Sequence, residues 1–276
     1  MGNSASVSIF RRSVLFGRLL WQNNYMIRSM VARDLRARYM GSLMGVFWSV
    51  IHPLTQIALY YFIFSVVLKI RLGAEYAGTS FAMWMIAGLL PWLFVAEVVT
   101  RAPSAVVEQA NLVKKMPFPS ELFSIVNLSA ALVNHLVAMS LFIGFMVVSG
   151  VGVSLKLLLI IPYLVVAAVF GLGIAWLLSS VNVFIRDVGQ ITGVVVNIWY
   201  FLTPIVYPRT MIPESLQKVF ALNPMLYITE GYRTALLGKP EMDLVGYGYV
   251  AVIALSIIVV GATVFRRLKP VFADVL

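Results

Sequence analysis

Three ionisable side chains lie inside long apolar runs, where a charge or a proton could take part in transport. They are His52, Glu97 and His135. A charge at the centre of a membrane helix costs about 2.5 to 3.5 kcal/mol, so intramembrane acids often mark proton- or sodium-coupled transport. Most acids of this chain, however, stand near the ends of apolar runs, as Glu121 and Asp187 do. We therefore interpret the two histidines as hydrogen-bonding groups in helix packing, and ion coupling as the less favoured hypothesis.

The sequence lacks the motif that binds the phosphates of ATP in a P-loop. Such a loop needs G-x-x-x-x-G-K-S/T, so that backbone amides and a lysine hold the phosphates. The one Gly-Lys pair, Gly238-Lys239, is followed by Pro240. With no cysteine and only two separated histidines, a disulfide framework and a Cys-based metal site are also excluded. An energy source on a separate ATPase subunit is the prediction that follows.

Aromatic side chains gather in two of the apolar runs. The groups are Tyr60, Tyr61 and Phe64 in one run, and Trp199, Tyr200 and Phe201 in another. Two roles fit such groups: packing and anchoring in the membrane, or stacking against the C–H faces of sugar rings in a polysaccharide channel. Consecutive helical residues point about 100° apart, so three of them do not face one pore together. We expect one or two of each group to line a channel.

A basic segment precedes the first long apolar run. On a helix, Arg28, Arg33 and Arg36 share one arc, with methionine, isoleucine and valine on the opposite arc, while Asp34 and Arg38 break the pattern. The spacing predicts an amphipathic helix in the membrane interface. Two interpretations stay open. The arginines either anchor the cytoplasmic side, or one of Arg33, Arg36 and Arg38 also contacts an anionic lipid-linked substrate.

Composition identifies a polytopic membrane protein, with 61% of its 276 residues hydrophobic and 12% charged. Six runs reach the roughly 20 apolar residues that a bilayer-spanning helix needs. They cover 43–68, 80–100, 121–148, 156–181, 188–207 and 244–265. Most Lys and Arg residues flank one side of these runs, which the positive-inside rule assigns to the cytoplasm together with both termini.

The expected fold is therefore all-α. A cytoplasmic segment with the amphipathic helix covers 1–42, and one six-span domain covers 43–276. The net charge of +10 follows from the distribution of cations around the spans and indicates no nucleic-acid partner.

A polar connection joins the second and third runs over 101–121. Within it Val106, Ala110 and Val113 recur at helical spacing, which predicts a short amphipathic helix ended by Pro117 and Pro119. A solvated connector and a docking element for a cytoplasmic partner are both compatible with this pattern.

Turn signals interrupt the fifth run and continue beyond it. Thr203-Pro204 and Tyr207-Pro208 break the run, and a short helix is predicted over 213–222. Asn223-Pro224 can cap and open a second helix, which Gly238 can end. We expect both helices to stack outside the membrane, either as a lid or gate or as a compact hairpin without function.

Two close pairs of residues predict packing rather than chemistry. Gly41 and Gly45 form a G-x-x-x-G pair at the start of the first run, where it permits close approach of helices. Glu230 and Arg233 lie three residues apart in the second short helix, a spacing that favours a local ion pair over a substrate site.

An ordered set of motifs over about residues 30–276 resembles the permease subunit of bacterial ABC-2 type polysaccharide exporters, the family that exports O-antigen, capsule and teichoic acid. The motifs are RDLRARYMGSLMGVFWSVIHPL, EQANLVKKMPFP, VNVFIRDVGQI, TPIVYP, NPM followed by GYR, and FRRLKPVFADVL. Two departures from the family pattern fall near the second motif, where Gln109 replaces a frequent Asn and Leu122-Phe123 replaces a Leu-Pro step.

The resemblance implies a half-transporter in the bacterial inner membrane, with both termini cytoplasmic. Two copies of the chain would form the pore, and two copies of a nucleotide-binding ATPase subunit would bind ATP and Mg²⁺, with no cofactor on this chain. The substrate would be a polysaccharide on a polyprenyl diphosphate lipid, surrounded by membrane lipids.

The resemblance also implies roles by position for four groups of residues. These are ATPase coupling for Glu108, Asn111, Lys114 and Lys115; the lipid diphosphate region for Arg33, Arg36 and Arg38; the sugar path for Tyr60, Tyr61, Phe64, Trp199 and Tyr200; and the exit gate for Tyr207, Pro208, Asn223 and Tyr232. Alternatives to polysaccharide export are an ABC-2 exporter of small hydrophobic molecules or of another lipid, an ion-coupled secondary transporter, and a passive structural membrane partner.

Overall fold

The described part of the chain is helical and contains no strand. The computed structural model describes residues 17–18, 21–38, 44–69, 72, 76, 78–115, 118–152, 154–239 and 241–276. The predicted all-α class is confirmed. Gly41 of the predicted glycine pair, Pro117 of the predicted helix stop and most of the segment 1–16 lie outside these ranges.

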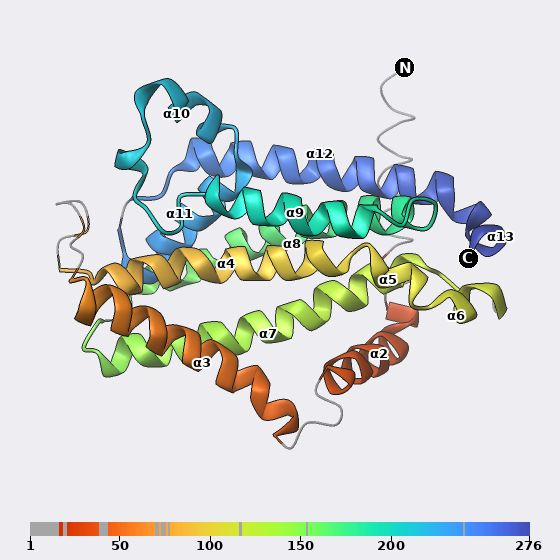
Figure 1. Ribbon diagram of the computed structural model, residues 1–276, viewed down its shortest axis with the longest axis horizontal. Helices are drawn as coiled ribbons and strands as arrows, with labels where there is room; N and C mark the ends of the chain where they lie inside the picture. Colours follow the sequence, from red (N-terminus) through yellow and green to blue (C-terminus); the bar gives the residue numbers. More distant parts are fainter. Residues whose placement is uncertain are drawn as a thin grey trace.

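Five helical segments are long and apolar enough to cross a membrane. They are α3 (Trp48–Tyr61) with its π-helical continuation (Phe62–Val67), α4 (Phe81–Arg101), α7 (Glu121–Val148), α8 (Ile160–Asn182) with the 3₁₀ turn before it (Leu155–Leu159), and α12 (Leu244–Leu268) with the short α13 (Phe272–Val275). They form an elongated bundle (Figure 1).

The sixth predicted span, 188–207, is shorter than expected. Its helix, α9 (Val188–Phe201), has 14 residues. At about 1.5 Å per residue it is about 21 Å long, less than the roughly 30 Å hydrocarbon core. The helix stops before Thr203-Pro204 because proline has no backbone N–H to continue it. The chain then runs without regular structure to Tyr207.

The two short helices predicted after the fifth run are present as α10 (Glu214–Ala221) and α11 (Pro224–Leu237). The predicted caps of α11 are confirmed. The Asn223 side chain accepts a hydrogen bond from the Met225 amide at 3.0 Å, and Gly238 ends the helix with a φ of 74°. A positive φ of this kind costs glycine least, which explains the residue type.

The prediction that both helices stack outside the spans is wrong for α11. This helix lies among the long helices, with contacts to α4, α8 and α12, and nearly all of its residues from Met225 to Leu236 are buried. In Figure 1, α10 projects from the end of the bundle, whereas α11 lies between α10 and the long helices. The sequence suggested an external helix because Glu230 and Arg233 would be costly inside an apolar bundle if they had no partners.

Contacts of the Arg233 guanidinium explain how α11 can enter the bundle. Its Nη1 donates to Glu230 at 2.7 Å, which confirms the predicted local pair. Nε donates to the Trp84 carbonyl oxygen at 3.2 Å, and Nη2 donates to the carbonyl oxygens of Pro204 at 2.9 Å and Ile205 at 3.1 Å. The side chain is completely buried, and it joins α11 to α4 and to the segment after α9.

At the other end of the bundle, α2 (Asn24–Ala37), α5 (Ser104–Val107), α6 (Ala110–Lys115) and α13 gather together (Figure 1). A second apolar cluster holds them to the spans and includes the buried residues Val106, Leu122, Phe265 and Phe272. The described N-terminal helix and the C-terminal helix therefore lie at the same end, and its cytoplasmic location stays a prediction of the positive-inside rule.

The closest helix pair, α8 with α12, depends on two glycines. A side chain on Gly173 would place its Cβ 2.6 Å from the Ile258 backbone nitrogen, and one on Gly261 would overlap the Gly173 carbonyl oxygen. Small residues at such a crossing let the two backbones approach.

We expect Gly261→Ala to destabilise the protein by about 1 to 3 kcal/mol, because the added methyl group has no space. The measurement is thermal unfolding of the purified protein in detergent. Gly144→Ala in α7 is the matched control, since its Cβ would meet nothing within 4 Å. Equal unfolding temperatures for the two variants would contradict the proposed packing.

Candidate functional site

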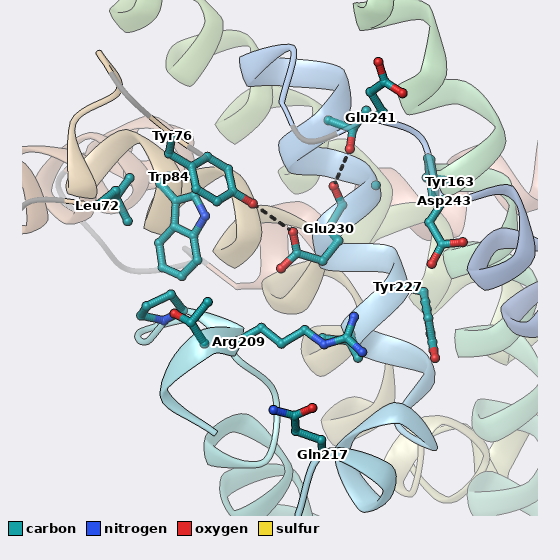
Figure 2. A pocket seen from close by; sticks show the side chains of 15 residues that line it. Leu72, Tyr76, Trp84, Tyr163, Arg209, Gln217, Tyr227, Glu230, Glu241 and Asp243 are labelled. Atoms are coloured by element: carbon teal, nitrogen blue, oxygen red, sulfur yellow. Dashed lines mark hydrogen bonds between the residues drawn. The ribbon is translucent and has the colours of Figure 1, made fainter. Parts of the chain in front are cut away.

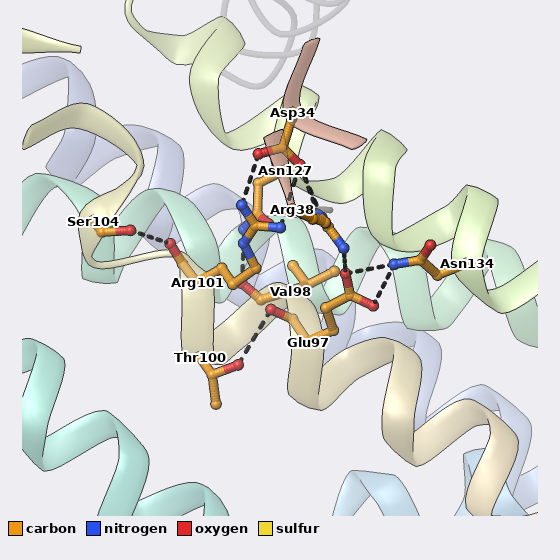
Figure 3. A network of polar contacts seen from close by, with 9 residues as sticks. All are labelled: Asp34, Arg38, Glu97, Val98, Thr100, Arg101, Ser104, Asn127 and Asn134. Carbon is orange, nitrogen blue, oxygen red and sulfur yellow. Dashed lines mark hydrogen bonds and ion pairs between the residues drawn. The ribbon is translucent and has the colours of Figure 1, made fainter. Parts of the chain in front are cut away.

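A network of charged side chains joins α2 to the inner half of the bundle (Figure 3). Asp34 of α2 lies at its centre. Its carboxylate accepts from Arg38 at 2.9 and 3.1 Å and from Arg101, at the end of α4, at 2.7 and 3.2 Å. One carboxylate therefore binds two guanidinium groups from two helices.

The same network continues from Arg38 to Glu97 of α4, with which it forms an ion pair. Asn134 of α7 donates its amide to both oxygens of Glu97, at 2.9 and 3.3 Å. Burial lowers the pKa of the Arg38 guanidinium, but its bonds to Glu97 and Asp34 outweigh this effect and raise the pKa overall. Arg38 thus stays charged and ties α2 to α4 and α7.

The three arginines predicted for the lipid diphosphate region face different surroundings. Arg38 binds two carboxylates of its own chain. Arg33 donates to Gln109 at 3.3 Å and lines a cavity of about 380 Å³ together with Asp34 and Arg101. Arg36 is exposed. The structure brings Arg33 and Arg38 to one side of α2 against the protein, and their role toward a lipid stays a prediction.

The predicted single helix of the 101–121 connection is split into α5 and α6 by a turn at Glu108 and Gln109. Val106 is buried beneath it, as the apolar spacing predicted. The four residues predicted to couple to an ATPase lie at the solvent-facing side of this split segment and are exposed: Glu108, Asn111, Lys114 and Lys115. The break coincides with the contact that Gln109 makes to Arg33, a long-range contact that helical spacing does not reveal.

The predicted aromatic residues form two separate clusters. Trp199 and Tyr200 of α9 both pack against Trp92 of α4, with ring centroids 5.3 and 5.7 Å apart. Tyr60 and Phe64 contact each other at 6.2 Å. The other members face elsewhere: Tyr61 packs edge-on against Phe145, and Phe201 is 65% exposed. One or two residues of each group therefore share an environment, as expected from helical geometry.

Asn223 connects the end of α9 to the start of α11. Besides capping α11, it accepts from the Trp199 indole at 2.9 Å. Its amide donates to the Leu202 carbonyl oxygen at 3.0 Å and to the Thr203 hydroxyl at 2.9 Å. This predicted exit-gate residue thus satisfies backbone groups that the interrupted helix leaves open.

The other three predicted exit-gate residues are not together. The Tyr207 hydroxyl donates to the Phe201 carbonyl oxygen at 2.5 Å, and burial raises the pKa of this hydroxyl. Pro208 lines a cavity beside α11. Tyr232 is completely buried and shares a hydrogen bond of 3.0 Å with His135. The interpretation of His135 as a packing hydrogen-bonder is confirmed.

Sequence reasoning missed Trp92, Arg101 and Asn134 as members of these clusters. One signal for the charged network was available. Asp34 and Arg38 broke the amphipathic pattern of α2, and residues four apart with opposite charge can pair on a helix. Glu97 was singled out for reaching inward, and it does so by binding Arg38 and Asn134.

The geometry of these helices belongs to a known class of membrane protein. The model of the ABC-2 type transporter family matches residues 25–237, so the chain is a member of this family. Among curated proteins, an O-antigen export system permease protein (RfbA) of Klebsiella pneumoniae is 28% identical over 248 residues, covering 88% of this chain and 92% of that protein.

Two further relatives extend this result. An O-antigen export system permease protein of Myxococcus xanthus is 25% identical over 259 residues, 93% of this chain and 97% of its own. The polysialic acid transport protein KpsM of Escherichia coli is 19% identical over 248 residues, 87% of this chain and 92% of its own.

We expect Asp34→Asn to loosen α2, because Arg38 and Arg101 lose the carboxylate that neutralises them. The side chain is 25% exposed, so we expect a loss of about 1 to 2 kcal/mol rather than the larger cost of a fully buried pair. The measurement is amide hydrogen exchange across α2. Asp274→Asn, an exposed carboxylate in α13 at the same end, is the control. Unchanged protection of α2 would refute the role of this network.

A second prediction concerns the joint between α9 and α11. Asn223→Ala removes the helix cap and three further hydrogen bonds, and should lower the stability of the detergent-solubilised protein by about 1 to 2 kcal/mol. Asn223→Ser keeps a cap but is too short for the other contacts, so its unfolding temperature should lie between those of the wild type and the alanine variant. If serine restores full stability, Asn223 acts only as a cap.

Proposed function

We propose that this chain is the membrane-spanning permease subunit of an ATP-driven polysaccharide exporter. The observation that carries this proposal is the match over nearly the whole chain to permeases named for O-antigen export, in a family of transporters. The matched relatives are covered over more than nine tenths of their length, so the similarity extends over the whole membrane domain.

The finer proposal is that two copies of the chain enclose the path of a glycan carried on polyprenyl diphosphate. Two features support it. The helices with the predicted channel aromatics, α3 and α9, are little buried in one copy: α3 buries Ile57, and α9 buries Thr192 and Val196. A second copy would cover such faces, and aromatic rings suit sugar C–H faces.

The energy would come from a separate ATPase that docks on α5 and α6. The sequence has no P-loop, and the exposed Lys114 and Lys115 with Glu108 and Asn111 give this end of the protein a polar, protruding surface. The surface is attached to α4 through Arg101 and to α2 through Gln109, so a force applied there reaches the spans.

The test is reconstitution of this chain with the ATPase encoded beside it into vesicles that contain lipid-linked glycan. We expect ATP-dependent transfer of glycan to the opposite side of the membrane. The double variant Lys114→Glu, Lys115→Glu should reduce transfer and glycan-stimulated ATP hydrolysis at least about tenfold, since reversed charges remove docking contacts and oppose the partner surface.

Lys218→Glu in α10 is the matched control, because it makes the same charge change on an exposed helix at the opposite end. It should export normally. Transport that needs a proton gradient and no ATP, or no transfer of any lipid-linked glycan by the wild type, would overturn the proposal.

A further inference from the structure

A cavity of about 650 Å³ lies beside α11, at the end of the bundle away from α2 and α13. Figure 2 shows it enclosed by residues of α4, α8, α10, α11 and the segments between them. The volume falls within the roughly 300 to 1,000 Å³ of small-molecule sites. None of the residues with an assigned role forms its polar wall.

A fixed carboxylate forms one wall of this α11 cavity. One oxygen of Glu230 accepts from the buried Arg233 at 2.7 Å, and the other accepts from the Tyr76 hydroxyl at 3.2 Å. The Glu230 side chain is still 22% exposed, so its remaining acceptor positions can be reached from the cavity.

An unpaired donor lies opposite this carboxylate. The Trp84 side chain is 1% exposed, and its indole Nε1 has no hydrogen-bond partner within the described residues. Figure 2 shows this nitrogen on the edge of the ring that is turned toward Glu230. A buried donor left unpaired costs about 1 to 3 kcal/mol, so a ligand oxygen at this position would recover part of that cost.

The apolar wall consists of tyrosines. Tyr163 lies directly against the backbone of Gly231, where a Cβ would overlap its ring, and Tyr227 lines the same side of the cavity. Gln217 of α10 adds an amide at the rim. Aromatic faces combined with a carboxylate, an amide and an N–H donor suit a sugar ring, which presents C–H faces and hydroxyl groups.

Charge narrows the class of sugar. Glu230 is neutralised by Arg233, whereas Glu241, Asp243 and the single cation Arg209 also line the cavity. This balance leaves the described lining slightly negative. Such a lining repels glycans with repeated carboxylates and accepts uncharged ones.

We propose that the α11 cavity binds one or more uncharged sugar units of the exported glycan as the chain leaves the bundle. A ligand hydroxyl oxygen accepts from Trp84 Nε1, a ligand hydroxyl donates to Glu230, and Tyr227 contacts a C–H face. This inference rests on the proposed export of polysaccharide and assigns the exported chain to the neutral class.

The experiment measures binding of soluble tetrasaccharides to the full-length chain in lipid nanodiscs by saturation-transfer NMR titration. The probes are neutral tetrasaccharides of mannose, galactose and N-acetylglucosamine, and tetrasialic acid of the same length. We expect at least one neutral probe to bind and the acidic probe not to bind.

Variants locate the binding. Trp84→Phe removes the donor and keeps an aromatic ring over Arg233, and we expect Kd to rise about three- to tenfold, as for loss of one hydrogen bond. Gln217→Ala on exposed α10 should weaken binding without altering the thermal unfolding temperature, so the inference is testable even if position 84 tolerates no change. Lys218→Ala, the next residue on α10, is the control and should leave Kd unchanged.

Absence of binding by all neutral probes, equal binding of tetrasialic acid, or unchanged Kd in both variants would overturn the assignment of the cavity. Export of lipid-linked glycan is measured with the same wild-type preparation. Export without tetrasaccharide binding refutes the cavity site alone. Binding without export refutes the exporter proposal and, with it, the role of the cavity in the glycan path.

Discussion

The architecture of the outer half of this protein depends on the buried guanidinium of Arg233. A charge there without partners would cost several kcal/mol, and here it is met by Glu230, three backbone carbonyl oxygens and the face of the Trp84 ring, whose centroid lies 3.6 Å from Cζ. Gly88 makes the arrangement possible, since a Cβ at this position would lie 2.6 Å from the guanidinium. Because these acceptors come from α4, α11 and the chain after α9, their relative positions are set by one side chain.

Helix α4 links this region to the opposite end of the bundle. Its first turns contact Arg233 through Trp84 and Gly88, and its last turns carry Glu97 and Arg101, which bind α2. Most of the helix is buried between these points. A rigid, contiguous element therefore connects the surface where an ATPase would act with the cavity beside α11. Contiguity supplies a physical route for coupling, and the charge-reversal and exchange measurements test whether it is used.

The sequence predicted those features that depend on local chemistry. Asn223-Pro224 and Gly238 marked both ends of α11 because caps and positive φ select these residue types. The spacing of Glu230 and Arg233 predicted their ion pair. The location of α11 could not be read in this way, because it depends on carbonyl oxygens of Pro204 and Ile205, which no side-chain pattern encodes. Likewise, Arg38 read as a membrane-facing cation until its distant partner Glu97 was known, and the apolar run 188–207 gave no sign of how far α9 would extend past its last regular turn.

The irregular backbone between α9 and α11 limits how this end of the protein can move. Polar backbone groups at such a depth are tolerated only where protein groups satisfy them, and here Asn223 and Arg233, both on the α11 side, bind Leu202, Pro204 and Ile205. Pulling α11 away from this segment would leave a buried guanidinium and several carbonyl oxygens unpaired at once. Moving α11 and the segment together keeps those bonds and breaks only contacts to neighbouring helices. An opening that widens the path for a glycan is therefore cheapest as a rigid displacement of both elements, with the Trp84 and Gly88 contacts to α4 as the bonds that must be exchanged.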